Sequence, residues 1–297
     1  MLITLTAVLA ALPAQGQTGG SEIGFDVSAG YRQDSNVNIA ATDMTTGEAD
    51  AAILLNFGID GSFPVADRLS FDLGYKYAST AYETWSDFDL AVHHARAAVQ
   101  YRFGGFDSAV SFDRFAAQVD GEQFLDVRQA SPSLSRLLGD KVYLRGSYIR
   151  AEKKYAVKAE RDAFNDAIRA DVYVLLDGMQ RYLAFGYRMD SEDATANEFD
   201  YDGVSAKVAY GHGLQFARLK LDLKMHVQFE NRHYAGVSEA IGAPRRDQRV
   251  RAGLNAAIPL SEHFSLKGEV EYADNASNFA AANFDEAVYS LNLAAGF

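Results

Sequence analysis

The chain has no cysteine, few prolines, one tryptophan and no long hydrophobic run beyond its first residues. Without cysteine there is no disulfide framework, no thiolate nucleophile and no cysteine-type zinc site. Five prolines and 24 glycines among 297 residues exclude a proline-rich or low-complexity chain. Walker A, GxGxxG and HExxH motifs are also missing. We therefore expect neither a cofactor nor a metal site.

Basic residues are outnumbered by acidic ones, and the formal net charge is −12. Binding to duplex nucleic acid depends on Lys and Arg neutralising phosphates, so nucleic acid is not an expected partner. Aromatic residues make up 12% of the chain, which argues against disorder. No run of 18 apolar residues follows residue 16. A membrane crossing would therefore be made by strands closed into a barrel, which satisfies its backbone hydrogen bonds in lipid.

The first 16 residues, MLITLTAVLAALPAQG, have the pattern of a signal peptide. The apolar run from Leu2 to Leu12 is too short for a bilayer-spanning helix, and Ala14 and Gly16 suit positions −3 and −1 of a cleavage site. No Lys or Arg precedes the run, and a buried strand is the alternative interpretation. We predict a signal peptide over 1–16 and one barrel domain over 17–297.

The clearest periodicity lies in residues 218–230, where apolar side chains from Leu219 to Phe229 alternate with charged or polar ones. A period of two over this length gives one apolar and one charged face, whereas a helical stripe would recur every three or four residues. Ordinary strands have about 5–6 residues, and a tilted membrane strand needs about 9–11 to cross the hydrocarbon. The same alternation recurs in 22–32, 53–59, 68–77, 249–260 and 264–272.

Short turns alternate with longer polar connections along the chain. The predicted turns lie near 64–67, 104–105, 139–140, 177–179, 213–216 and 261–263, and the predicted loops cover 33–47, 83–86, 119–126, 155–162, 192–199, 234–246 and 275–282. Short periplasmic turns opposite longer outer loops are typical of outer-membrane barrels. The pattern predicts an all-β fold, a closed antiparallel transmembrane β-barrel of about 14 strands in a bacterial outer membrane. Twelve or sixteen strands are the alternatives, and a lumen of intermediate width is expected to be narrow or plugged.

Two segments depart from this pattern. Between residues 127 and 138 the alternation breaks, and Pro132 removes a ladder donor from the middle of the strand. Between residues 88 and 103 the apolar set changes parity near His93 and His94, which predicts a β-bulge.

The last segment, 287–297, alternates apolar residues up to a terminal phenylalanine. This pattern resembles the recognition signal that the outer-membrane barrel assembly machinery reads, so the resemblance implies that machinery and outer-membrane lipid as partners. The positions that carry the signal are Tyr289, Leu291, Leu293, Ala295 and Phe297.

A second resemblance concerns both ends of the barrel. Residues 245–247 read Arg-Arg-Asp, two alternating strands follow, and the chain then reaches Asn275 and the pair Ser277-Asn278; residues 34–38 read DSNVN after the first strand. This layout resembles the C-terminal barrel domain of the surface lipoprotein assembly modifier family. The positions that carry it are Asp34, Asn36, Asn38, Arg246, Asp247, Ser277 and Asn278.

The family resemblance implies a barrel that helps a secreted lipoprotein across the outer membrane. Members of the family carry a periplasmic helical-repeat domain ahead of the barrel, and no 34-residue helical period is present in these 297 residues. For Arg246 and Asp247 we favour an ion pair that joins the base of a loop to the wall over a contact with substrate.

The strand faces expected to point inward carry a surplus of basic residues over acidic ones. The predicted lumen-lining cations are Arg32, Arg68, Lys76, Arg96, Arg102, Arg145, Arg169, Arg218, Lys220, Lys224, Arg249 and Arg251, with Lys141 and Lys267 beside them. Pairing with acids across neighbouring strands would neutralise the lumen and is the default expectation. A conducting lumen that prefers anions is the alternative.

No Ser/His or Asp/His pair stands out as a catalytic motif, so we do not expect an enzyme. We predict a porin-like transport or secretion barrel that passes a small solute or a secreted lipoprotein. The alternative is a structural or adhesive surface protein that acts through its acidic loops.

Overall fold

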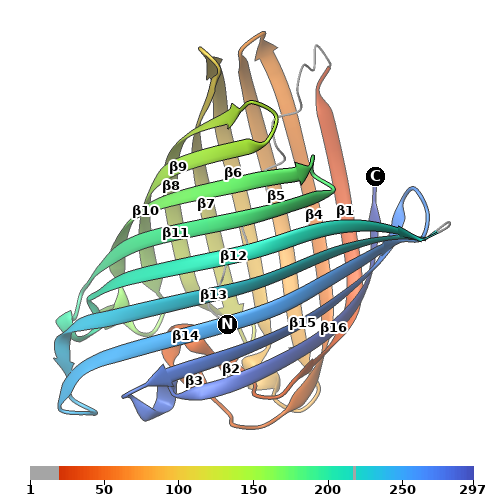
Figure 1. Cartoon of the computed structure of the whole chain (residues 1–297). Helices are drawn as coiled ribbons and strands as arrows, with labels where there is room; N and C mark the ends of the chain where they lie inside the picture. The colour runs from red at the N-terminus through yellow and green to blue at the C-terminus, as the bar shows by residue number, and fades with distance from the viewer. Residues whose placement is uncertain (1–19, 217–218) are drawn as a thin grey trace.

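The computed structural model describes residues 20–216 and 219–297, so the predicted signal peptide lies outside the described residues. Fourteen strands form one closed antiparallel barrel, and two short strands form a separate hairpin (Figure 1). The barrel strands are β1 (Glu22–Asp34), β4 (Asp50–Ala66), β5 (Leu69–Tyr82), β6 (Leu90–Phe103), β7 (Phe106–Val119), β8 (Glu122–Leu138), β9 (Val142–Tyr155), β10 (Ala163–Asp177), β11 (Arg181–Ala194), β12 (Tyr201–Phe216), β13 (Leu219–Ser238), β14 (Ala243–Pro259), β15 (Phe264–Ser277) and β16 (Phe284–Gly296). The predicted fold class and strand number are confirmed.

The hairpin and five short helical turns lie in the connections. The hairpin consists of β2 (Asn38–Ile39) and β3 (Met44–Thr45), and the 3-10 turns are η1 (Ala40–Thr42), η2 (Ser86–Phe88), η3 (Ala159–Arg161), η4 (Asn197–Phe199) and η5 (Ala280–Ala282). All of these lie at the end of the barrel where β1 ends and β16 begins, opposite to the C-terminus (Figure 1). None of the helices in the described part of the chain is long and apolar enough to cross a membrane.

The barrel closes where β1 pairs with β16 on one side and with β4 on the other. Gly30 pairs with Asn292 across this seam, and a Cβ atom on Gly30 would lie 2.5 Å from the carbonyl oxygen of Leu291. A side chain there would displace backbone, so the close approach of the two strands requires glycine.

Large apolar side chains point away from the barrel on every side. Ile168 on β10 is 67% exposed, Phe112 on β7 is 59% exposed, and Leu291 on β16 is 55% exposed. An exposed apolar band that encircles a molecule is far larger than the patches that soluble monomers tolerate. The solvent of this surface is therefore the hydrocarbon of a membrane, and the alternating partners of these residues face the lumen.

Several predicted connections are wrong because strands continue beyond the apolar band. The predicted turn at 213–216 lies within β12, where Gly213 still pairs with Asp222 of β13, and the connection at 217–218 lies outside the described residues. The predicted loop at 119–126 is a tight turn through Asp120 and Gly121, with φ of 50° and 72°. The predicted loop at 234–246 shrinks to 239–242, because β13 and β14 extend as a polar hairpin.

The predicted bulge at His93 and His94 is also wrong. β6 pairs with β5 and β7 in unbroken register through both histidines. His93 points outward, where its Nδ1 lies 2.7 Å from the hydroxyl of Tyr75, and His94 lies 2.9 Å from Asp113 on the opposite face. A histidine side chain can lie on the lipid face or on the lumen face. Two adjacent histidines therefore shifted the apparent alternation of apolar residues, although the register of β6 is unbroken.

Pro132 interrupts one ladder only. β8 pairs with β9 up to Ala130 and resumes at Ser133, whereas Pro132 itself remains in register with Val110 of β7. The missing N–H therefore breaks hydrogen bonding locally, and β8 continues as one strand.

Candidate functional site

The connection between β1 and β4, residues 35–49, crosses the mouth of the barrel. Its residue Asp43 contacts Arg161, which lies between β9 and β10, and Arg245 on β14. β10 is seven strands away from β1 in either direction around the barrel. The loop therefore reaches the far wall, and we call it the crossing loop.

Side-chain amides fold the crossing loop into a compact hairpin. The Oδ1 atom of Asn36 accepts hydrogen bonds from the Thr45 hydroxyl at 2.7 Å and from the Gly47 N–H at 3.1 Å. The Nδ2 group of Asn36 donates to the carbonyl oxygen of Asp285 on β16 at 3.1 Å, and that of Asn38 donates to the carbonyl oxygen of Asn36 at 2.8 Å. Such local bonds are what makes asparagine a turn-forming residue.

Burial shows that this loop is packed. Val37 is fully buried and Ile39 is 5% exposed. Asp34, at the end of β1, is fully buried as well and accepts hydrogen bonds from the Tyr82 hydroxyl at 3.0 Å and from the Asn36 N–H at 3.2 Å. The predicted family-like positions Asp34, Asn36 and Asn38 thus lie together and hold the crossing loop.

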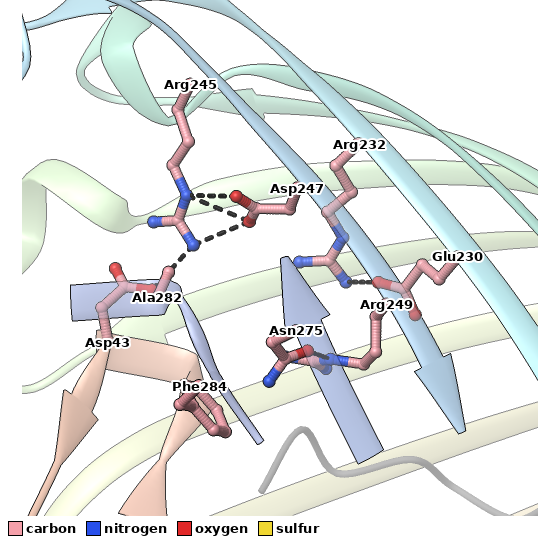
Figure 2. A pocket seen from close by; sticks show the side chains of 9 residues that line it. All are labelled: Asp43, Glu230, Arg232, Arg245, Asp247, Arg249, Asn275, Ala282 and Phe284. Carbon is pink, nitrogen blue, oxygen red and sulfur yellow. Dashed lines mark hydrogen bonds and ion pairs between the residues drawn. The ribbon is translucent and has the colours of Figure 1, made fainter. Parts of the chain in front are cut away.

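At the tip of the loop, Asp43 lies between two arginines. Its carboxylate accepts a hydrogen bond from Arg161 at 2.6 Å. It also accepts one from Arg245 at 2.8 Å, and the Arg245 guanidinium donates to Asp247 at 2.7 Å (Figure 2). Burial by itself raises the pKa of Asp43, but the hydrogen bonds and charges of Arg245 and Arg161 outweigh it and hold that pKa below its ordinary value. We call Asp43, Arg161 and Arg245 the latch.

The latch continues into the second half of the family-like motif. Asp247 accepts a hydrogen bond from the Ser277 hydroxyl at 2.7 Å, and the Oδ1 atom of Asn278 accepts from the Arg246 N–H at 2.8 Å. The Arg246 side chain itself is exposed. The arginine that pairs with Asp247 is therefore Arg245, because alternation along β14 turns Arg245 and Asp247 inward and Arg246 outward.

Sequence reasoning missed Arg245, Arg161 and Asp43. The signal for Arg245 was present, since it is two residues before Asp247 and so on the same strand face. Nothing in the sequence signals the contact of Asp43 with residues more than 100 positions away.

Below the latch, the inward side chains of β9–β14 form what we call the basic wall. Several of its cations are paired: Arg169 with Asp171 at 2.8 Å, Arg232 with Glu230 at 2.7 Å, and Lys153 of β9 with Glu192 of β11. Pairing, the default expectation, therefore accounts for part of the wall.

Other cations of the basic wall have no acidic partner in the described chain. Lys207 and Lys224 form neither a hydrogen bond nor a salt bridge among the described residues, Arg145 donates to the Ser133 hydroxyl at 3.3 Å, and Arg249 donates through Nε to the amide oxygen of Asn275. One terminal nitrogen of Arg249 is buried without a partner in that part of the chain. The wall therefore keeps a net positive charge.

The inward side chains of β4–β8 form what we call the balanced wall, which differs from the basic wall in its charges. Asp113 accepts from both Arg96 at 3.2 Å and His94 at 2.9 Å, and Arg102 pairs with Asp107 at 3.0 Å. Ser131, Ser133 and Ser135 of β8, together with Ala98 and Ala117, supply small side chains. Together with Asp60 on β4 and Asp72 on β5, which form no salt bridge in the described chain, the acids of this wall at least offset its cations.

The remaining predicted lumen cations lie in different places. Arg32 on β1 is bound by Asp34 and Glu286, Lys76 lies on β5 in the balanced wall, and Arg251 lies on β14 beside Gln228. Arg68 lies exposed in the turn between β4 and β5, Lys220 lies exposed near the start of β13, and Arg218 is outside the described residues.

Two spaces lie within the barrel. A cavity of about 20 Å³ beneath the latch is lined by Asp43, Arg232, Arg249 and Phe284 among others (Figure 2). A chamber of about 680 Å³ lies in the lumen, and its lining mixes polar side chains, among them Arg32, Asn56, Lys224, Lys267 and Asn292, with apolar ones such as Leu54, Val92 and Leu223.

The assembly-signal residues lie on the outer face of β16 and just beyond it. Tyr289, Leu291 and Leu293 are each more than half exposed toward the lipid. Phe297 stacks on the ring of His263, with 5.1 Å between ring centroids, and its backbone pairs with Phe25 of β1.

No protein-family model and no curated protein matches the sequence. In structure the chain is similar to an anion-selective porin from Comamonas acidovorans, with a TM-score of 0.56 and 8% identity over 94% of this chain and 99% of that one. It is also similar to outer-membrane-expressed OmpT of Vibrio cholerae, with a TM-score of 0.54 and 11% identity over 95% and 99% of the two chains. OmpF of Salmonella typhi in complex with daunomycin gives a TM-score of 0.54 and 9% identity over 94% and 98%.

At these identities the likeness shows the fold. Together with the encircling apolar band, it identifies the protein as a β-barrel of the bacterial outer membrane.

Proposed function

We propose that the protein is a diffusion pore through which small anions cross the outer membrane. The observation that carries the proposal is the surplus of unpaired cations on the basic wall, of which Lys207, Lys224 and Arg249 are the clearest. Fixed charge that lines a narrow aqueous path attracts counter-ions and repels co-ions. The similar porin from Comamonas acidovorans is described as anion-selective, which is consistent with such a role for this fold.

The crossing loop limits the width of this path. It is held across the mouth by the latch and by Asn36. A barrel of this strand number is narrower than the open porins of 16 to 18 strands. The pore is therefore suited to small solutes.

Reversal potentials in planar bilayers under a salt gradient test the proposal. We expect the wild-type protein to prefer chloride over potassium, and the preference to weaken as salt shortens the Debye length, about 10 Å at 0.1 M. Arg249→Glu combined with Arg251→Glu should move the reversal potential toward cation preference. A cation-selective wild-type pore would contradict the proposal, and steady silence in bilayers would favour a structural or adhesive role.

A second candidate is a translocation barrel that resembles surface lipoprotein assembly modifiers. The observation that favours it is the clustering of Asp34, Asn36, Asn38 and Asp247 around the crossing loop, which gives the family-like positions one shared structural role. The test is protease accessibility of lipoproteins on intact cells with and without this chain. Unchanged surface exposure of every lipoprotein would exclude it.

A further inference from the structure

Four cations of the basic wall converge on one part of the lumen. Lys207 on β12 and Arg251 on β14 both pair in register with Gln228 of β13, so they flank it in one row across the sheet. Arg169 lies on β10, and Lys224 lies on the same face of β13 as Gln228, four residues before it. The positive charges of Lys224, Arg169 and Arg251 all repel the ammonium group of Lys207.

The acids near this cluster are already engaged. Asp171 accepts three hydrogen bonds from the guanidinium of Arg169, at 2.8 to 3.1 Å. Glu271, which attracts both Lys207 and Arg251, lies 3.7 Å from Nε2 of His226. Lys207 and Lys224 are half-buried and lack hydrogen bonds or salt bridges in the described chain.

Each of these two lysines has a glycine as a cross-strand neighbour. Lys207 pairs with Gly186 of β11, where the carboxylate of Asp171 lies close by, and Lys224 pairs with Gly211 of β12, over which the ring of Tyr182 packs. Lys224 also belongs to the lining of the 680 Å³ chamber. Half-buried like charges repel one another, so an anion bound between them would relieve that repulsion and supply the missing acceptors.

We propose that Lys207 and Lys224, backed by Arg169 and Arg251, form a binding station for a small divalent oxyanion of the phosphate type. A tetrahedral oxyanion offers acceptor oxygens in several directions, which suits ammonium groups that arrive from two strands. This inference rests on the proposed anion pore in that it names the class of anion that the lumen holds in transit.

Isothermal titration of inorganic phosphate into the detergent-solubilised full-length barrel, in a chloride background, measures the station directly. We expect saturable binding by the wild-type protein. Lys207→Gln combined with Lys224→Gln should weaken it by about tenfold for each ammonium lost, the value of a charge-assisted hydrogen bond. Melting temperatures of the variants should stay close to that of the wild type, because neither lysine holds another residue.

The matched control removes the same formal charge from the balanced wall, through Lys76→Gln with Arg96→Gln. It should bind phosphate as the wild type does. Absence of saturable binding by the wild type, equal affinity in the lysine variant, or an equal loss in the control would each overturn the station.

Current measurements on the same purified protein distinguish a failure of the phosphate-binding station from a failure of the proposed anion pore. Anion-selective currents without phosphate binding would leave the pore and refute the station. Phosphate binding in a cation-selective or silent barrel would leave the station and refute the pore.

Discussion

The two walls of the lumen share one barrel and differ in chemistry. On the basic wall, β9–β14, cations exceed acids, and Lys207 and Lys224 form no ion pair in the described chain. On the balanced wall, β4–β8, Asp113 alone engages both Arg96 and His94. The difference sets an electric field across the lumen, and the crossing loop spans it from β1 to β14 with an aspartate at its tip. Loop and wall therefore attract each other, which explains why the loop folds inward.

The largest expected effect is a loss of barrel stability. It should follow from placing a charge on the lipid-facing side, which is apolar on both walls. Val227→Arg on β13 and Phe112→Arg on β7 place a charge where side chains are 54% and 59% exposed to lipid. Each should destabilise the barrel by about 2–4 kcal/mol if it lies near the bilayer midplane. Heat-modifiability on gels and denaturant midpoints in liposomes measure this.

Alanine at the same two positions serves as the control and should assemble. A clear difference between the two arginine variants would mean that the two walls differ on their lipid faces as well as on their lumen faces.

The next effect concerns the contact that joins the loop to the basic wall. Asp43→Ala removes two charge-assisted hydrogen bonds, each worth about 1.5–3 kcal/mol. The open population of the crossing loop should rise by roughly a hundredfold or more. Single-channel conductance should increase, and cysteine pairs introduced across the loop base would report the movement. Unaltered conductance together with an unaltered crosslinking pattern would show that the latch does not limit the pore.

Acidification should loosen the same contact in the wild type. Because the pKa of Asp43 in the closed loop lies below its ordinary value of 3.8, closure favours the carboxylate. Its contribution is complete above pH 3.8 and is lost as the pH falls through the lowered pKa. Conductance should therefore rise only below pH 3.8, and Asp43→Asn should lack this step while conducting like the acidified wild type.

The smallest effect is expected on the balanced wall. Arg96→Gln combined with Asp113→Asn should change the reversal potential only slightly, because the two charges of the pair are removed together and the net charge of the lumen stays the same. Lys207→Gln, which removes a cation that has no ion pair in the described chain, should reduce anion preference more. Equal shifts from the two variants would contradict the difference between the walls.

Much of the fold was predictable because a barrel strand has one face in lipid and one in water. The alternation of 218–230 predicted β13 correctly, although the strand extends eight residues farther, to Ser238. Above the hydrocarbon both faces of a strand are polar, and the sequence then resembles a loop. That is why the connections at 119–126 and 234–246 were wrong.

The sequence by itself determined the closed antiparallel barrel, its lipid-facing residues and the surplus of basic side chains on several strands. These properties depend on residues two positions apart, which the chain order contains directly. The tertiary structure alone decided which cations are paired, that the basic surplus gathers on one wall, and that Asp43 meets Arg161 and Arg245 across the mouth. Those contacts join residues 118 and 202 positions apart. They depend on register and on the closure of fourteen strands, which no local pattern records.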